Sequence, residues 1–413
     1  MTNKRNRNLH IVREPGESKV LWAGGEKAAK QAVEEMQDQA ERDRKKFRRR
    51  VLIIVGAVAL LAAAVFLVIR LQTYGSVRVE ETYKIDGVTD SSYREFADGV
   101  LKYSRDGVSY LNIRGEEQWN QSVQFKNPFV EINGTTAAVA DKGGNNILVV
   151  QEEGVKGEIR TTLPIEKIAV SRQGIVSAIL KNEASPQVIC YDTAGNILVE
   201  HQASFTGTGY PVDVALSEDG QMMMVVYLSV EGGRYTSSVS YYDFGEPEGT
   251  GVNHQAAGKS YENTVLASGF FLNDSVSAVV GDNCITIFKG KGKPEETAAI
   301  SLDKEIKSVF HNEKYIGLVL KNKGKRGYEL CLYNASGKKV MSEDFSGDYG
   351  NIKLSGNQVI MYSGRKCSIF LSGGVKKFEG EMDNDILEIR PISGVNKYVV
   401  MNANGMEDIR LVK

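Results

Sequence analysis

Histidine and cysteine are the first candidates for metal binding or catalysis, because their side chains supply many metal ligands and nucleophiles in proteins. The four histidines are scattered along the chain: His10, His201, His254 and His311. The four cysteines are scattered too: Cys190, Cys284, Cys331 and Cys367. No CxxC pair occurs, so the spacing predicts no metal site. The cysteines are interpreted as small buried side chains within strands, and a disulfide is left open.

Short catalytic motifs give no assignment either. The sequence contains no HExxH, GxSxG or GxxxxGK[ST] pattern. The basic, glycine-rich run at 290–293 precedes no predicted helix that would help to hold a phosphate, so it is predicted to be a hairpin turn. The run at 141–146 lacks the ligand series of a calcium loop and is also predicted to be a turn. We therefore assign no catalytic, cofactor-binding or metal-binding residue from the sequence.

Two features are more typical of recognition than of catalysis. Of the eighteen tyrosines, several lie near predicted turns, and tyrosine is a good contact residue, although half-buried strand packing explains most of them. These tyrosines are Tyr210, Tyr227, Tyr235, Tyr241 and Tyr242. The stretch 245–263 is longer than a turn requires and has no apolar periodicity. It is interpreted as a contact loop or as a slack outer strand.

A long apolar run divides the chain into two parts. From Val51 to Ile69, nineteen residues carry no charge and no polar side chain, and as a helix they would span roughly 30 Å of hydrocarbon. We predict a transmembrane helix at 51–70. The basic residues that precede it place the N-terminus in the cytoplasm by the positive-inside rule, and a cleaved signal peptide is the weaker alternative. These residues are Lys45, Lys46, Arg48, Arg49 and Arg50.

The part before this run is predicted to be cytoplasmic. Residues 1–25 are polar and are predicted to be disordered, whereas residues 26–50 contain no glycine or proline and are predicted to form a juxtamembrane helix. The basic end of this helix is expected to bind anionic lipid head groups. Residues 1–50 hold fourteen Lys/Arg and eight Asp/Glu, a balance of +6, which leaves about -7 for the remainder. A mildly acidic body predicts no nucleic-acid partner.

Residues 77–413 alternate short β-rich runs with Gly, Asn and Asp turns. The clearest strand–turn–strand copies lie at 188–198 and 330–340, where an Asp or Asn can bond to its own backbone and a Gly supplies a positive φ. Two further runs precede each copy, so a unit has four strands. Units begin near residues 93, 129, 165, 211, 264, 306, 350 and 385. This spacing predicts an all-β propeller of four-stranded blades, with eight blades favoured and seven the alternative.

The two ends of this region are predicted to meet. The last unit, from Asp385 to Lys413, has room for only about three strands, while residues 77–85 read as a lone strand before the first unit. We predict that this strand completes the last blade and removes an open sheet edge. Its alternation is expected to place Val77, Val79, Tyr83 and Ile85 on one face.

Two runs resemble the repeat of quinoprotein-type (PQQ-like) β-propellers, namely 191–198 and Gly115 to Trp119. That repeat has an Asp, a Gly three residues later, and an aromatic residue, often Trp, four residues after the Gly. The layout also resembles an uncharacterised family of single-span bacterial membrane proteins, a domain of unknown function, whose exterior is such a propeller. The resemblance covers roughly residues 77–413 and implies the fold more than an activity.

The sequence departs from true quinoprotein dehydrogenases in ways that bear on activity. Those enzymes stack Trp residues around the ring and hold a quinone with a calcium ion and a catalytic Asp. This chain has only Trp22 and Trp119, and it has no adjacent cysteine pair to cover a quinone. We therefore carry over no cofactor and no catalytic residue.

The hypothesis that the sequence favours is a non-enzymatic protein of the bacterial cell surface. Its extracytoplasmic propeller would be anchored by one helix and would act as a binding or scaffold module for a protein, a peptide or a cell-envelope glycan. The alternatives are a ligand sensor coupled to the juxtamembrane helix, and a quinoprotein-like enzyme or a hydrolase with its site in the central channel. Converging carboxylates or histidines at the propeller axis would favour the enzyme.

Overall fold

The structure is a computed structural model that describes residues 25–70, 72–85, 88, 90–182, 185–204, 207–245 and 255–413. The chain divides after Arg70 into two compact units. The first contains one continuous helix, α1 (Gly25–Arg70). Its segment Arg44–Val68 is long and apolar enough to cross a membrane, and none of that segment is buried. A membrane span and an N-terminal signal sequence both have this length and composition.

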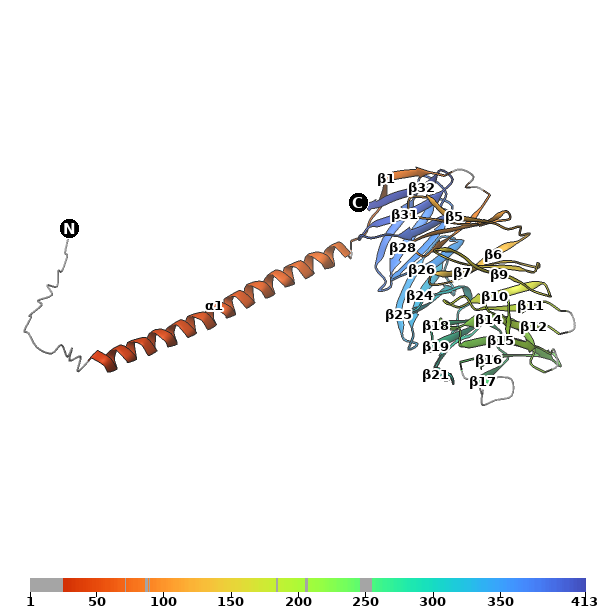
Figure 1. Cartoon of the computed structure of the whole chain (residues 1–413), viewed down its shortest axis with the longest axis horizontal. Helices are drawn as coiled ribbons and strands as arrows, with labels where there is room; N and C mark the ends of the chain where they lie inside the picture. Colours follow the sequence, from red (N-terminus) through yellow and green to blue (C-terminus); the bar gives the residue numbers. More distant parts are fainter. Residues whose placement is uncertain are drawn as a thin grey trace, which may run out of the picture. The chain divides into compact units, whose positions relative to one another are not determined.

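The second unit consists of eight antiparallel sheets of four strands each (Figure 1). Blade 1 contains β2 (Ser92–Phe96), β3 (Gly99–Ser104), β4 (Gly107–Leu111) and β5 (Glu117–Ser122). Blade 2 contains β6 (Pro128–Asn133), β7 (Thr136–Asp141), β8 (Asn146–Gln151) and β9 (Gly154–Arg160). Blade 3 contains β10 (Ile165–Val170), β11 (Val176–Leu180), β12 (Gln187–Tyr191) and β13 (Ile197–Gln202). Blade 4 contains β14 (Tyr210–Leu216), β15 (Met222–Glu231), β16 (Arg234–Asp243) and β17 (Gln255–Glu262).

The remaining blades repeat this order. Blade 5 contains β18 (Leu266–Asn273), β19 (Val276–Gly281), β20 (Cys284–Lys289) and β21 (Glu295–Ser301). Blade 6 contains β22 (Ile306–His311), β23 (Tyr315–Lys321), β24 (Tyr328–Asn334) and β25 (Lys339–Phe345). Blade 7 contains β26 (Asn351–Ser355), β27 (Gln358–Ser363), β28 (Lys366–Leu371) and β29 (Lys376–Glu381). Blade 8 contains β30 (Glu388–Pro391), β31 (Lys397–Asn402), β32 (Gly405–Val412) and the N-terminal strand β1 (Ser76–Lys84).

The predicted propeller is therefore confirmed with eight blades, and the alternative of seven blades is wrong. Each predicted unit start lies within three residues of the first strand of a blade. The agreement has a physical cause, because the turn residues that mark each unit also form its hairpins. In blade 3, Asp192 Oδ1 accepts hydrogen bonds of 2.9 Å from the backbone N–H groups of Ala194 and Asn196, and Gly195 has a φ of 83°. Asn334 and Gly337 form the same turn in blade 6.

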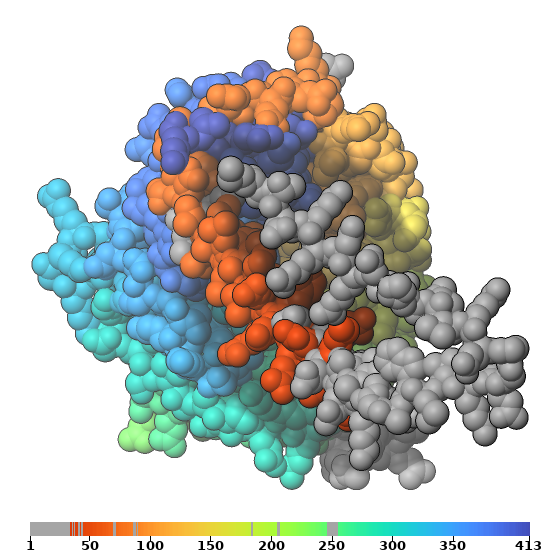
Figure 2. All heavy atoms as spheres, turned by 90° about the vertical axis from the view of Figure 1, so that its left-hand side faces the viewer, coloured from red at the N-terminus to blue at the C-terminus, as the bar shows by residue number. Residues whose placement is uncertain are grey.

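The predicted ring closure is also confirmed. Strand β1 pairs antiparallel with β32, from Ser76 opposite Val412 to Lys84 opposite Gly405. In Figure 2 the colours follow the blades around the ring, and the orange start of the propeller adjoins its dark blue end. The described residues also form eight hydrophobic clusters, one for each pair of neighbouring blades, including blades 8 and 1. The ring is therefore closed by side-chain packing as well as by strand pairing.

One expectation about β1 is wrong. A β-bulge at Glu80 shifts the register between Val79 and Glu81, so the strand changes face part of the way along. Val77 packs into the cluster between blades 7 and 8, whereas Tyr83 and Ile85 pack into the cluster between blades 8 and 1. The four apolar residues therefore do not share one face, and β1 contributes to both interfaces of its blade.

The cysteines all lie in the third strand of a blade. Cys190, Cys331 and Cys367 are buried, Cys284 is half-buried, and none of the four forms a disulfide. Burial raises the pKa of each of the three buried thiols to about 12. These thiols pack as small apolar side chains and are not poised as nucleophiles.

Candidate functional site

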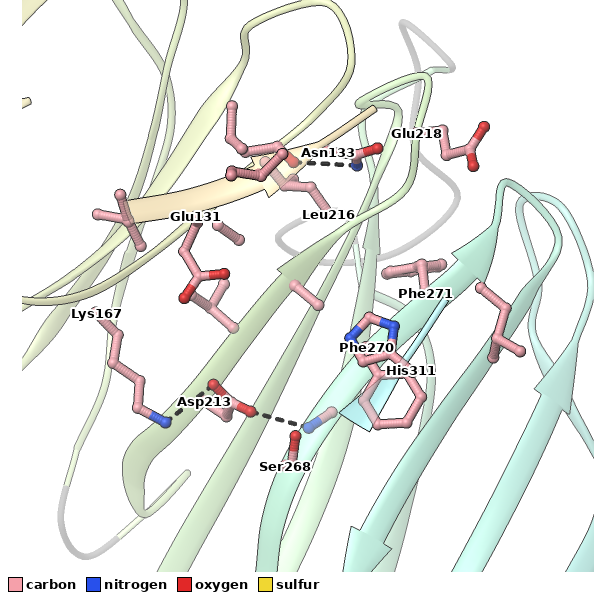
Figure 3. A pocket seen from close by; sticks show the side chains of 18 of the residues that line it. Glu131, Asn133, Lys167, Asp213, Leu216, Glu218, Ser268, Phe270, Phe271 and His311 are labelled. Atoms are coloured by element: carbon pink, nitrogen blue, oxygen red, sulfur yellow. Dashed lines mark hydrogen bonds and ion pairs between the residues drawn. The ribbon is translucent and has the colours of Figure 1, made fainter. Parts of the chain in front are cut away.

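The first strand of each blade lies closest to the propeller axis, and five of these strands surround a pocket. They are β6, β10, β14, β18 and β22, from blades 2 to 6. The pocket has a volume of about 670 Å³, which is within the usual range for small-molecule sites. We call it the channel pocket, and Figure 3 shows it from close by. The side chains discussed below are Glu131, Lys167, Asp213, Leu216, Phe270, Phe271 and His311.

Local backbone irregularities position the polar side chains of this pocket. Four neighbouring first strands carry a register shift at the same place, just before Lys167, Asp213, Ser268 and Ser308. A bulge inserts one extra residue and turns the following side chain relative to the regular pleat. A repeated bulge in four adjacent blades therefore sets the direction of one polar residue per blade, and three of these four residues line the pocket.

Asp213 is held firmly by two neighbours. Its Oδ1 lies 3.1 Å from Lys167 Nζ in the adjacent blade, and its Oδ2 accepts a hydrogen bond of 2.9 Å from the backbone N–H of Gly269 (Figure 3). These contacts join blades 3, 4 and 5 across one side of the pocket. Both carboxylate oxygens of Asp213 therefore have a partner within the protein.

The Glu131 carboxylate differs from that of Asp213, because it forms no hydrogen bond or ion pair with the described residues. Its side chain extends from β6 into the pocket (Figure 3) and is accessible to water there. Partial desolvation by the surrounding protein atoms, together with the charge of Asp213, raises the pKa of Glu131 to about 7, against the opposing effect of Lys167 and Arg94.

The opposite wall of the pocket is aromatic. The rings of Phe270 and His311 are stacked, with centroids 3.9 Å apart and planes within 4° of parallel. Desolvation lowers the pKa of His311 to about 4, so the imidazole is neutral at physiological pH. The His311 ring is exposed and Phe270 is buried behind it, and the half-buried Phe271 lies on the same side (Figure 3). Leu216 is buried in the core between blades 3 and 4. The pocket therefore has a charged side and an apolar side.

The first strands of blades 7, 8 and 1 carry a network of ion pairs between one lysine and two glutamates. Lys353 Nζ on β26 lies 2.8 Å from Glu95 on β2 and also contacts the carboxylate of Glu388 on β30. Ser355 donates a further hydrogen bond of 2.9 Å to Glu95. We call Lys353, Glu95 and Glu388 the closure network. Desolvation lowers the pKa of Lys353, but the two carboxylates outweigh that effect and raise it above its usual value.

The two runs that were predicted to be turns connect adjacent strands. Residues 290–293 join β20 to β21, and Lys291 forms an ion pair of 3.0 Å with Asp219. Residues 141–146 join β7 to β8. There, Asp141 Oδ1 accepts hydrogen bonds of 2.9 and 2.7 Å from the backbone N–H groups of Lys126 and Asn127. This carboxylate therefore organises a loop.

The residues considered for recognition are separated by the fold. Tyr227, Tyr241 and Tyr242 are buried, Tyr210 is half-buried and donates a hydrogen bond to Glu166, and Tyr235 is exposed on β16. The stretch 245–263 was considered as a contact loop or as an outer strand. Its part Gln255–Glu262 forms the outer strand β17 of blade 4, and residues 246–254 lie outside the described residues.

The histidines do not meet. His201 on β13 contacts Tyr242 at 3.2 Å, His311 lies in blade 6, and His10 and His254 lie outside the described residues. Within the described ranges, no group of three or more His, Cys, Asp or Glu side chains is placed to hold a metal ion. The channel pocket does gather Glu131, Asp213 and His311, but no recorded hydrogen bond links them into a proton relay. As arranged, these groups can bind a charged ligand.

Sequence reasoning missed Glu131, Lys167 and Asp213 as a group. A usable signal was present, because the first run of four of the eight units has a charged residue between two apolar neighbours, as in Val130-Glu131-Ile132 and Val212-Asp213-Val214. In a strand with one side toward the axis, such a residue marks the channel face.

The fold and the site together define a closed eight-bladed β-propeller with a mixed polar and apolar pocket at its axis. The chain belongs to a family of unknown function, DUF5711, whose model matches residues 70–411. No curated protein matches the chain in sequence.

Several solved structures are similar to the propeller. BamB from Moraxella catarrhalis has a TM-score of 0.49 and 11% identity, and the match covers 81% of this chain and 99% of BamB. Hydrazine synthase from Kuenenia stuttgartiensis has a TM-score of 0.44 and 11% identity, covering 71% and 99%. Hsv2 from Kluyveromyces lactis has a TM-score of 0.46 and 8% identity, covering 71% and 98%.

Proposed function

We propose that this protein is a membrane-anchored binding module whose propeller lies outside the cytoplasm and receives its ligand in the channel pocket. The observation that carries the proposal is the pocket itself. Five first strands surround a volume of about 670 Å³, and three of its polar side chains, Lys167, Asp213 and Ser268, follow repeated bulges. Side chains on a closed ring of strands are held rigidly, as a binding site requires.

Membrane anchoring is supported by the segment Arg44–Val68, which is apolar, unburied and of sufficient length. The cytoplasmic position of the N-terminus is supported by five exposed basic residues at the start of this segment. In the proposal these residues also bind anionic lipid head groups: Lys45, Lys46, Arg48, Arg49 and Arg50.

The topology is tested with two cysteine variants of the full chain in intact bacterial cells. Glu231 lies exposed at the tip of the β15–β16 hairpin, and Gln39 lies exposed on α1. A membrane-impermeant maleimide should label Glu231→Cys in intact cells and Gln39→Cys only after permeabilisation. The parent chain is the control for its own four cysteines. The reverse labelling pattern, or recovery of the chain in the soluble fraction, would overturn the proposal.

A ligand sensor and a quinoprotein-like enzyme are the two alternative functions that the sequence predicts. Each of them has its own test. Ligand-dependent crosslinking within residues 26–50 would favour the sensor, and stabilisation of the purified chain by calcium together with a quinone would favour the enzyme.

A further inference from the structure

We propose that the channel pocket selects ligands that carry an ammonium group on an apolar body. The ammonium group pairs with the Glu131 carboxylate, and the hydrocarbon part packs against the wall formed by Phe271 and the ring of His311. This inference rests on the proposed binding function and names the chemical class of the ligand.

The balance of charge in the pocket favours a cation. Its lining residues include five carboxylates and three basic side chains. Two of the basic side chains already have acidic partners, since Lys167 pairs with Asp213 and Arg172 lies 3.3 Å from Glu218. An anionic ligand would therefore have to compete with internal carboxylates for Lys167 and Arg172, which leaves the exposed Lys142, whereas a cation meets an excess of negative charge.

Glu131 is the carboxylate best placed to receive that cation. Glu166 accepts a hydrogen bond from Tyr210, Glu313 lies 3.6 Å from Lys314, and Asp213 and Glu218 have the partners given above. Glu131 has no recorded partner within the described part of the chain, yet it extends into the pocket (Figure 3). A carboxylate that faces the pocket without an internal partner can pair with a bound ammonium group, and the surrounding protein walls strengthen this attraction relative to bulk water.

The apolar wall determines the rest of the ligand. The exposed ring of His311 is held by its stack on the buried Phe270, and the half-buried Phe271 lies on the same side of the pocket (Figure 3). A cation is also attracted to an aromatic face, so the two sides of the pocket favour the same kind of molecule. A hydrophilic cation without a hydrocarbon body would leave this wall exposed to water.

Binding should depend on pH because Glu131 must be ionised. The groups that act on it are Arg94 from β2, Lys167 from β10 and Asp213 from β14. His311 on β22 stays neutral well below pH 7 and adds no charge in the relevant range. Affinity for an amine should therefore rise between about pH 6 and about pH 8 and then level off.

The experiment uses the detergent-solubilised full chain and three probes that share one body: 2-phenylethylamine, 2-phenylethanol and 3-phenylpropanoate. Titration followed by saturation-transfer NMR should rank the amine above the alcohol by roughly tenfold or more, with the acid weakest. Glu131→Gln should remove this preference and its pH dependence. Glu231→Gln, at an exposed hairpin tip, is the matched control and should leave both unchanged. The peptide Phe-Gly-Gly and its N-acetylated form test whether a peptide N-terminus is an equally good source of the ammonium group.

Each outcome has a definite meaning. If all three phenyl probes bind equally well, or if Glu131→Gln leaves the amine preference within twofold, the charge selectivity is wrong although the pocket still binds ligands. If no probe binds at all, both the selectivity and the proposed use of the channel pocket are wrong.

Discussion

At the scale of single residues, Glu131 and Asp213 differ in how much of their chemistry the fold uses. Asp213 is bound by a lysine and a backbone amide from the two neighbouring blades. Glu131 faces the same pocket with no recorded partner among the described residues, and desolvation raises its pKa to about 7. A destabilised polar group at an axial pocket is typical of a site that is shaped for a ligand more than for stability.

This difference predicts that Glu131→Gln stabilises the empty protein at neutral and alkaline pH. An ordinary glutamate ionises near pH 4.5, whereas Glu131 ionises near 7 in the folded protein. Between these values the folded state holds a proton that the unfolded chain has released, so stability falls as pH rises through this window. The variant lacks this fall. Water in the pocket screens the exposed Glu131 carboxylate and reduces the effect, so the Tm of the variant should exceed that of the parent by only on the order of 2 °C at pH 8, with little difference at pH 4.

Differential scanning calorimetry of the two proteins over this pH range makes the measurement. His311, whose pKa is lowered to about 4, titrates in both proteins and cancels in the comparison. Glu231→Gln controls for the loss of a negative charge as such. A variant that melts below the parent at pH 8 would contradict the account of Glu131.

At the scale of elements, β1 depends on a single inserted residue. The bulge at Glu80 allows one strand to fill two interfaces, with Val77 on one side and Tyr83 and Ile85 on the other. Glu80 also lies 3.1 Å from Lys397 and 2.6 Å from Arg410, but such solvent-accessible ion pairs contribute little. Its position in the backbone is therefore more important than its charge.

Deleting Glu80 should consequently destabilise the protein far more than neutralising it. The deletion restores a regular pleat and moves either Val77 or the pair Tyr83 and Ile85 out of its own interface to the opposite face of the blade, with an expected loss on the order of 3 kcal/mol. Glu80→Gln keeps the bulge and should have almost the stability of the parent. Chemical denaturation of both variants decides the point, and equal midpoints for the two would refute the role of the bulge.

At the scale of the whole molecule, eight blades close into one ring. The closure network links blade 8, where the two ends of the propeller pair, to its neighbours, blades 7 and 1. Lys353 of blade 7 contacts Glu388 of blade 8 and Glu95 of blade 1. Glu388 is almost fully buried, with 2% of its side chain exposed, so its charge depends on Lys353 for compensation.

Lys353→Met should therefore weaken the closed ring. It leaves two carboxylates without their shared cation, and the free energy of unfolding should fall by on the order of 3 kcal/mol. Lys307→Met is a matched control, because Lys307 is also on a first strand but, among the residues that the structure describes, forms an ion pair only with the exposed Glu305. Denaturant titration should give a clearly lower midpoint for the first variant, and a midpoint equal to that of Lys307→Met would contradict the proposed role.

Sequence alone determined the parts of this protein that depend on local periodicity. Alternating strands, Asp or Asn turns such as the one at Asp192, and the apolar run after Arg50 are all encoded within a few residues. Eight such units and a leftover strand at 77–85 were therefore enough to predict the ring and its closure.

Only the tertiary structure decided which residues meet at the axis. Glu131, Lys167, Asp213 and His311 belong to four different blades, and the distances between them depend on the curvature of the whole ring. A bulge changes the face of every residue that follows it, yet it leaves no clear mark in the alternation of side chains, as the reversal within β1 demonstrates. The site is thus a property of blade packing and register, which no short segment of the chain contains.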